Sequence, residues 1–107
     1  MANYSLKFLK KENDLNKILR DQKRTKKNIN ILFVSLWDDW CSTLVEKLKD
    51  EYSGTEEGTP LYVVDSFRMP HAFVIFRSQK LPHLVKIFKD KISSSDYLPE
   101  VYRSLKI

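Results

Sequence analysis

The side chain with the greatest chemical potential in this sequence is the thiol of Cys41, the only cysteine among 107 residues. It follows an apolar run, residues 31–34, and a Trp-Asp-Asp-Trp segment, residues 37–40. A strand that leads into a helix with a cysteine in its first turn is typical of a nucleophilic thiol, because the helix dipole favours the thiolate. A second cysteine three residues later would complete a disulfide, but that position holds Leu44. The pattern therefore predicts half of a thiol-disulfide site.

The elements that position Cys41 follow from hydrophobic spacing. We expect helices from residue 13 or 14 to before Lys23, over 41–52, and from a cap at 93–96 through 106. The expected strands are 5–9, 29 or 30 to 37, 61–65, 72–76 and 83–88. The near-continuous apolar run ending at Trp37 suits a central strand covered on both faces, with Trp37 facing the core, Trp40 exposed and His83 on a strand surface.

This order of elements predicts a mixed α/β sheet in three layers. A β-α-β opening indicates parallel strands with helices against the sheet, and the last two strands, 72–76 and 83–88, add an antiparallel hairpin. The length fits one domain, residues 1–107, without a linker or repeat.

Positive charge gathers at the start of the chain. Residues 1–27 contain nine Lys or Arg against three acids, although the whole chain carries a net charge of only +5. The simplest interpretation of the segment between Lys17 and Lys27 is a solvated helix face, with binding of acidic partners or nucleic acid as a weaker alternative. No aromatic residue interleaves with Lys23 to Lys27, so the sequence argues against nucleic acid as a partner.

Composition also limits the location and the cofactors. We expect neither a signal peptide nor a membrane segment, because the N-terminus lacks an apolar core and no run approaches about 20 apolar residues. One cysteine fits a reducing cytoplasm. One cysteine and two histidines without ligand spacing predict no metal site, and we expect no organic cofactor.

Two segments carry a family resemblance. Residues 33–41, Phe-Val-Ser-Leu-Trp-Asp-Asp-Trp-Cys, resemble the thioredoxin strand that leads into Trp-Cys-x-x-Cys. Residues 69–76, Met-Pro-His-Ala-Phe-Val-Ile-Phe, resemble the place where thioredoxins carry a cis-proline before an antiparallel hairpin. The resemblance covers Tyr4 to Leu105 and implies a thioredoxin-like fold. Because only residues 66–68 precede Met69 and Pro70 after the third strand, it also implies a fold shortened there.

The resemblance further implies a site around Cys41, the candidate nucleophile. His71, beside the expected cis-proline, is a candidate for stabilising the thiolate, although a histidine hydrogen-bonded at the core edge is the simpler interpretation. Ser35 replaces the buried carboxylate that assists the second cysteine in thioredoxins, so it and Leu44 affect the same step. The expected partner-binding residues are Trp40, Ser42, Thr43, Met69 and Pro70.

These residues leave two main functions open. In the first, a thioredoxin-like protein binds partner proteins and forms a mixed disulfide through Cys41, which places it in redox homeostasis but without a resolving thiol. In the second, the fold is a redox-inactive adaptor or accessory subunit. The chain is not a complete dithiol-disulfide oxidoreductase in either case.

Overall fold

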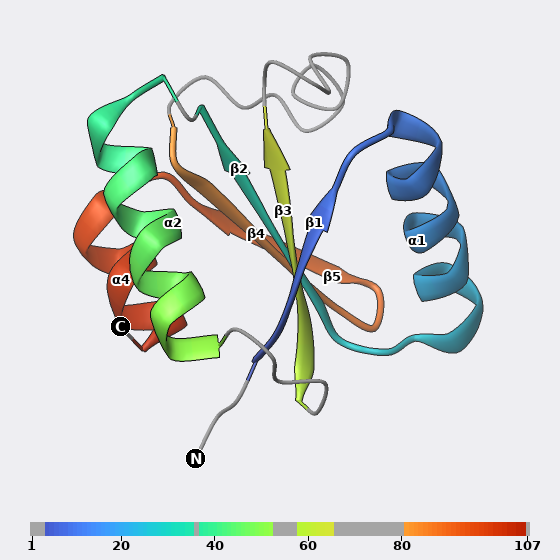
Figure 1. Cartoon of the computed structure of the whole chain (residues 1–107). Helices are drawn as coiled ribbons and strands as arrows, with labels where there is room; N and C mark the ends of the chain where they lie inside the picture. Colours follow the sequence, from blue (N-terminus) through green and yellow to red (C-terminus); the bar gives the residue numbers. More distant parts are fainter. Residues whose placement is uncertain (1–3, 36, 53–57, 66–80, 107) are drawn as a thin grey trace.

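The computed structural model describes residues 4–35, 37–52, 58–65 and 81–106. The described strands are β1 (Tyr4–Leu9), β2 (Ile29–Val34), β3 (Thr59–Asp65), β4 (His83–Phe88) and β5 (Lys91–Ser95). The described helices are α1 (Glu12–Thr25), α2 (Asp39–Tyr52) and α4 (Leu98–Leu105). The strands form one sheet in the order β1-β3-β2-β4-β5 (Figure 1).

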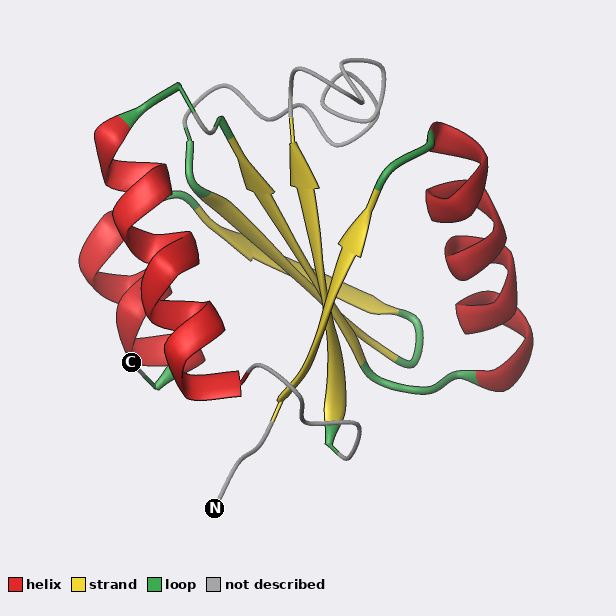
Figure 2. Cartoon of the chain, in the orientation of Figure 1, coloured by secondary structure: helices red, strands yellow, loops and turns green. Residues whose placement is uncertain are grey.

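The sheet is mixed, as the sequence predicts. Strands β1, β3 and β2 are parallel, β4 runs antiparallel to β2, and β5 runs antiparallel to β4. Helix α1 lies on one face, and α2 and α4 lie on the other (Figure 2). This arrangement confirms the three-layer architecture.

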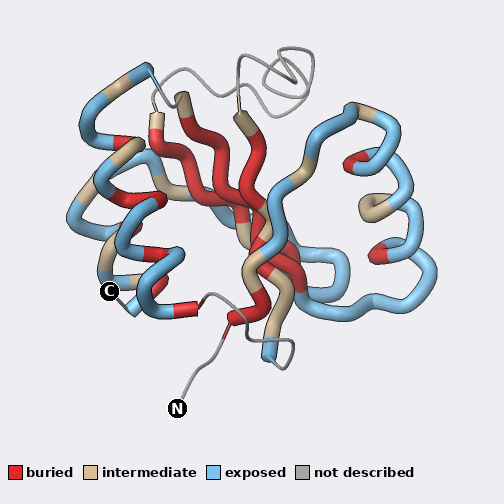
Figure 3. The backbone as a smooth tube through the Cα atoms, in the orientation of Figure 1, coloured by how far each residue is buried: buried red, intermediate tan, exposed pale blue. Residues whose placement is uncertain are grey.

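The core has one apolar cluster on each face of the sheet, and all six residues of β2 are buried between them (Figure 3). Alternate residues of a strand point to opposite faces, so Leu32 and Val34 pack towards α2 and α4 while Ile31 and Phe33 pack towards α1. The expectation of a central, doubly covered strand is confirmed. The strand ends at Val34 rather than at the predicted Trp37.

The sequence predicts a hairpin between residues 72–76 and 83–88, and this pairing is wrong. Strand β4 pairs with β5, and Phe88 lies opposite Lys91 in that pair. The sequence predicts a helix cap over residues 93–96, because three consecutive serines lack the apolar alternation of a strand. They form an exposed edge strand instead, and α4 begins later, at Leu98, with Pro99 in its first turn. The predicted strand 72–76 lies outside the described residues.

Helix α1 also extends further than its apolar stripe predicts, to Thr25. Buried Gln22 explains the extension, because its Nε2 donates to the carbonyl oxygens of Lys27 at 3.2 Å and Lys89 at 2.7 Å. Lys26 also pairs with Asp90 in the turn between β4 and β5. These contacts hold the end of α1 against the β4–β5 hairpin.

Candidate functional site

The candidate site begins where the chain leaves β2 and enters α2. Asp38 directly precedes the helix, and its Oδ1 accepts a hydrogen bond from the backbone N–H of Trp40 at 3.0 Å. The carbonyl oxygen of Ser35 accepts from the backbone of Asp38 at 3.0 Å, which closes the preceding turn. Asp38 therefore acts as an N-cap and places a carboxylate at the positive end of the helix dipole.

Cys41 lies in the first turn of α2, as predicted, but its side chain is fully buried. It belongs to the apolar cluster between the sheet, α2 and α4, together with Val34 and Leu44. Leu44 is also fully buried, one turn further along the helix. The position of the missing second thiol is thus a packed core position.

The surroundings of Cys41 oppose ionisation. Burial raises the pKa of the Cys41 thiol most, a hydrogen bond with the backbone of Ser35 lowers it by less, and the negative charge of Asp38 raises it by a smaller amount still. The helix dipole alone would favour the thiolate, but desolvation and the capping carboxylate act against it. Cys41 is consequently a neutral thiol at physiological pH.

Two tryptophans frame this buried thiol at the surface. Trp37 is 81% exposed and Trp40 is 66% exposed. The exposure of Trp40 agrees with the expectation, whereas the expected core position of Trp37 is wrong. The reason is that β2 ends at Val34, so Trp37 lies in the turn before α2 and not on the sheet.

The other predicted site residues separate into two groups. Ser42 is half-buried and Thr43 is exposed, both in the first turns of α2 next to Cys41. Met69, Pro70 and His71 lie outside the described residues, so their predicted roles stay predictions. His83, expected on a strand surface, is only 8% exposed and packs against Phe33 with a ring-centroid distance of 6.1 Å.

A cis peptide bond lies directly before β4, between Leu81 and Pro82. The resemblance implies a cis-proline before an antiparallel strand, and Pro82 is a cis-proline directly before β4, which pairs antiparallel with β2. Pro70, the residue expected in that role, lies outside the described residues, so its cis bond stays a prediction.

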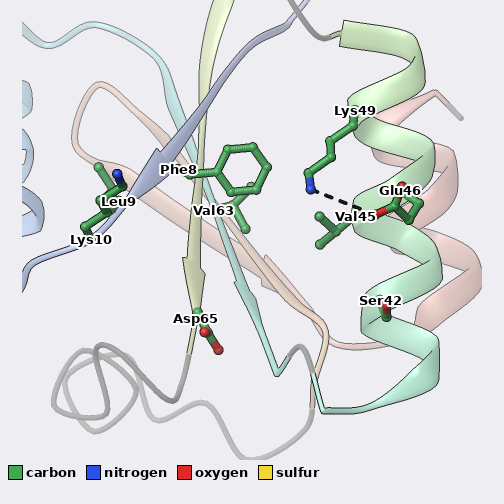
Figure 4. Close-up of a pocket in the computed structure, with 9 residues that line it drawn as sticks. All are labelled: Phe8, Leu9, Lys10, Ser42, Val45, Glu46, Lys49, Val63 and Asp65. Atoms are coloured by element: carbon green, nitrogen blue, oxygen red, sulfur yellow. Dashed lines mark ion pairs between the residues drawn. The ribbon is translucent and has the colours of Figure 1, made fainter.

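A groove that the sequence does not reveal runs between α2 and the strands β1 and β3, with a volume of about 360 Å³ (Figure 4). Its apolar lining comes from Phe8, Val45 and Val63. Lys49 borders it, with its Nζ 3.8 Å from Oε1 of Glu46 and 5.5 Å from the centre of the Phe8 ring. Ser42 belongs to the same lining, so the groove adjoins the first turns of α2.

Metal and membrane functions find no support in the described ranges. There, no three His, Cys, Asp or Glu side chains are grouped so that they could hold a metal ion. Among the helices α1, α2 and α4, none combines the length and apolar character needed to cross a bilayer.

Comparison with known proteins identifies the fold. No protein-family model matches the chain, and neither does any curated protein. Among solved structures, the thioredoxin pre-protein of Schistosoma mansoni matches with a TM-score of 0.73 and 18% identity, covering 95% of this chain and 96% of that one. Thioredoxin O2 of Arabidopsis thaliana matches with a TM-score of 0.71 and 18% identity, covering 94% of each chain. Thioredoxin NaTrxh of Nicotiana alata matches with a TM-score of 0.73 and 12% identity, covering 99% and 94%.

These likenesses extend over nearly the whole chain. The protein is therefore thioredoxin-like in fold, and its sequence holds a single cysteine, Cys41. Because the identities are below 20%, the comparisons define the architecture, and the function must be argued from the site.

Proposed function

We propose that this thioredoxin-like protein is a binding protein that recognises partner proteins through the surface at the start of α2 and does not turn over disulfides. The observation that carries the proposal is the contrast between a fully buried Cys41 and two exposed tryptophans beside it. Of the two functions that the sequence leaves open, this contrast favours the redox-inactive adaptor.

The burial of Cys41 argues against thiol chemistry on two grounds. Disulfide exchange requires a thiolate that reaches a sulfur of the target in line. The Cys41 sulfur is enclosed by core side chains, and its raised pKa keeps it protonated. Leu44 fills the position from which a second thiol would release a mixed disulfide. The attack on a target disulfide thus lacks an accessible thiolate, and the release of the mixed disulfide lacks a second thiol.

The surface around Cys41 has the composition of a binding site. Tryptophan is enriched among the residues that contribute most to protein–protein affinity, because it buries a large area with little loss of conformational entropy. Trp37 and Trp40 leave two indole rings exposed to water close together in the sequence. The groove beside Ser42 adds an apolar depression that suits a large side chain of a partner.

Single-thiol exchange through Cys41 is the competing function, and one feature supports it. Cys41 sits in the first turn of a helix, where a local opening of that turn would bring the sulfur to a partner's disulfide. A small thiol would then have to resolve the adduct. We place the protein in the cytoplasm in both cases, because a lone unpaired cysteine suits a reducing compartment.

Capture of partners by immobilised protein distinguishes the two functions. We expect Trp40→Ala to weaken partner binding about 30-fold or more, the loss typical of a central interface tryptophan. We expect Cys41→Ala to bind partners as the wild type does, in the presence or absence of reductant. Tyr97→Ala is the matched control, because Tyr97 is 63% exposed but lies at the start of α4. Loss of capture in Cys41→Ala, with Trp40→Ala unaffected, would refute the proposal.

A further inference from the structure

The fold gathers basic side chains from two distant parts of the sequence at one end of the molecule. Lys23, Arg24, Lys26 and Lys27 come from the end of α1 and the residues after it. Lys86, Lys89 and Lys91 come from β4, the turn and β5. The hydrogen bond from Gln22 to Lys89 and the ion pair between Lys26 and Asp90 hold the two groups together. We call these seven side chains the basic hairpin surface. Helix α1 and the hairpin turn lie away from α4 (Figure 1), whereas Lys86 of β4 also borders a hollow with Ser104 of α4.

This surface accounts for the whole net charge of the protein. Its seven basic residues are accompanied by two acidic ones, Asp21 and Asp90, which leaves an excess of five, equal to the net charge of the chain. Both acids are already paired, Asp21 with Arg24 at 3.6 Å and Asp90 with Lys26. Within the described residues, Lys23, Lys27, Lys86, Lys89 and Lys91 have no acidic partner. Lys86 also lines a small hollow, so the other four ammonium groups are available to the phosphates of an anionic ligand.

An aromatic ring and a small hollow accompany these charges. Phe88 is 51% exposed in β4, and the Nζ of Lys89 lies 5.5 Å from the centre of its ring. Phe88 also lines a hollow of about 220 Å³ whose polar wall includes Asn28, Thr59 and Lys86. A planar ring bordered by amide, hydroxyl and ammonium groups has the chemistry that contacts a nucleobase by stacking and hydrogen bonds.

We infer that the basic hairpin surface binds single-stranded nucleic acid, with lysines on the phosphates and one base stacked on Phe88 in the hollow. An acidic peptide would satisfy the lysines but would leave the ring and the polar hollow without a role. A membrane would require a broad apolar surface, whereas this hollow is small and mixes polar side chains with Ile29, Ile87 and the rings of Tyr4 and Phe88. The inference is independent of the partner surface at Trp40, which lies on a different helix, α2.

The chain offers a variant that removes charge without harming the fold. Lys89 has a left-handed backbone, with φ 57°, where glycine costs less than any residue with a Cβ. Lys27 is exposed, and its backbone oxygen, which a substitution keeps, accepts the hydrogen bond from Gln22. The double variant Lys27→Gln/Lys89→Gly therefore removes two phosphate contacts. Lys47→Gln/Lys106→Gly is its matched control, with the same charge change in α2 and at the left-handed cap of α4, where Lys106 has φ 59°.

The test is fluorescence anisotropy of labelled oligothymidylate of about twelve nucleotides, a length that spans one binding site of this kind. Four phosphate contacts predict that the affinity of the wild type falls about 50-fold when KCl rises from about 50 to about 200 mM. The Lys27/Lys89 variant keeps two contacts, so its affinity should fall only about 7-fold over the same range. We expect Phe88→Ala to weaken binding at least about fivefold, as loss of one stacked base does. The control variant should match the wild type, and all variants should melt as the wild type does.

Four results would overturn the inference. They are absence of binding at low salt, equal weakening by the double variant and its charge-matched control, unchanged binding in Phe88→Ala, and tighter binding of polyglutamate or of phosphatidylserine vesicles than of the oligonucleotide. In the fourth result, tighter binding of polyglutamate assigns the surface to an acidic protein, and tighter binding of the vesicles assigns it to a membrane.

Discussion

Trp40 and Cys41 are adjacent in the first turn of α2, yet the indole of Trp40 is 66% exposed while the thiol of Cys41 is fully buried. Consecutive helix residues differ by about 100° around the axis, so one can face water when the next faces the sheet. Here the surface position carries an exposed indole and the core position carries the thiol. This division is the basis of the proposal that the protein binds partners rather than exchanging disulfides.

The stability of a Leu44 variant tests whether the position where the resemblance expects a second cysteine is part of the core. We expect Leu44→Ala to lower the free energy of unfolding by about 2–5 kcal/mol, the range for large-to-small changes at fully buried sites. Urea denaturation followed by circular dichroism measures the change.

The neighbouring Thr43 provides the control for that measurement. It is exposed on the same helix, so Thr43→Ala should alter stability by no more than about 0.5 kcal/mol. Equal losses in the two variants would show that Leu44 is not packed as the structure places it.

Protonation of the buried His83 should make the stability of the fold depend on pH in the acidic range. Burial lowers its pKa, and the charge of Asp96 opposes this to a smaller extent. Since the unfolded chain then binds a proton more readily than the folded one, stability should fall as the pH drops below about 6.5 and level off below the folded-state pKa. His83→Phe keeps a ring against Phe33 but does not titrate, so its stability should decline less between neutral pH and pH 5 in urea titrations. Parallel curves for the two proteins would contradict this role.

Tyr52 joins α2 to the end of α4. Its buried hydroxyl donates to the carbonyl oxygen of Leu105 at 2.7 Å. We expect Tyr52→Phe to cost about 1 kcal/mol of stability in urea denaturation, because it removes one buried hydrogen bond and leaves that oxygen without this donor. Tyr97→Phe removes an exposed hydroxyl and should be neutral; a neutral Tyr52→Phe would mean that α4 is held by its apolar contacts alone.

The sequence predicts most of the sheet because β2, β3 and β4 are long apolar runs whose burial follows from their composition. It misses β5 because Ser93 to Ser95 contribute backbone pairing rather than apolar contacts, which a side-chain pattern does not reveal. The cis bond before Pro82 is missed for a related reason. Met69 and Pro70 precede one apolar run and Pro82 precedes another, and the sequence does not show that the run after Pro82 pairs with β2.

The sequence predicts that Cys41 lies at the start of a helix but not that its side chain is buried. The degree of its burial depends on how α2 packs on β2 and α4. The sequence shows the basic segment up to Lys27 but not that it meets the β4–β5 hairpin. The basic hairpin surface joins Lys27 to Lys89, more than sixty residues apart, through contacts of Gln22 that only the folded chain makes.

The reactivity of Cys41 in the native protein tests the central claim most directly. Ellman's reagent at pH 8, followed by intact mass, measures how fast the thiol forms a mixed disulfide in buffer and in guanidinium chloride. A buried thiol with a raised pKa should react at least about 100-fold more slowly in the native state than in denaturant, because reaction requires local opening. Native and denatured rates within a few-fold of each other, with the adduct on Cys41, would contradict the account and restore single-thiol exchange as the function.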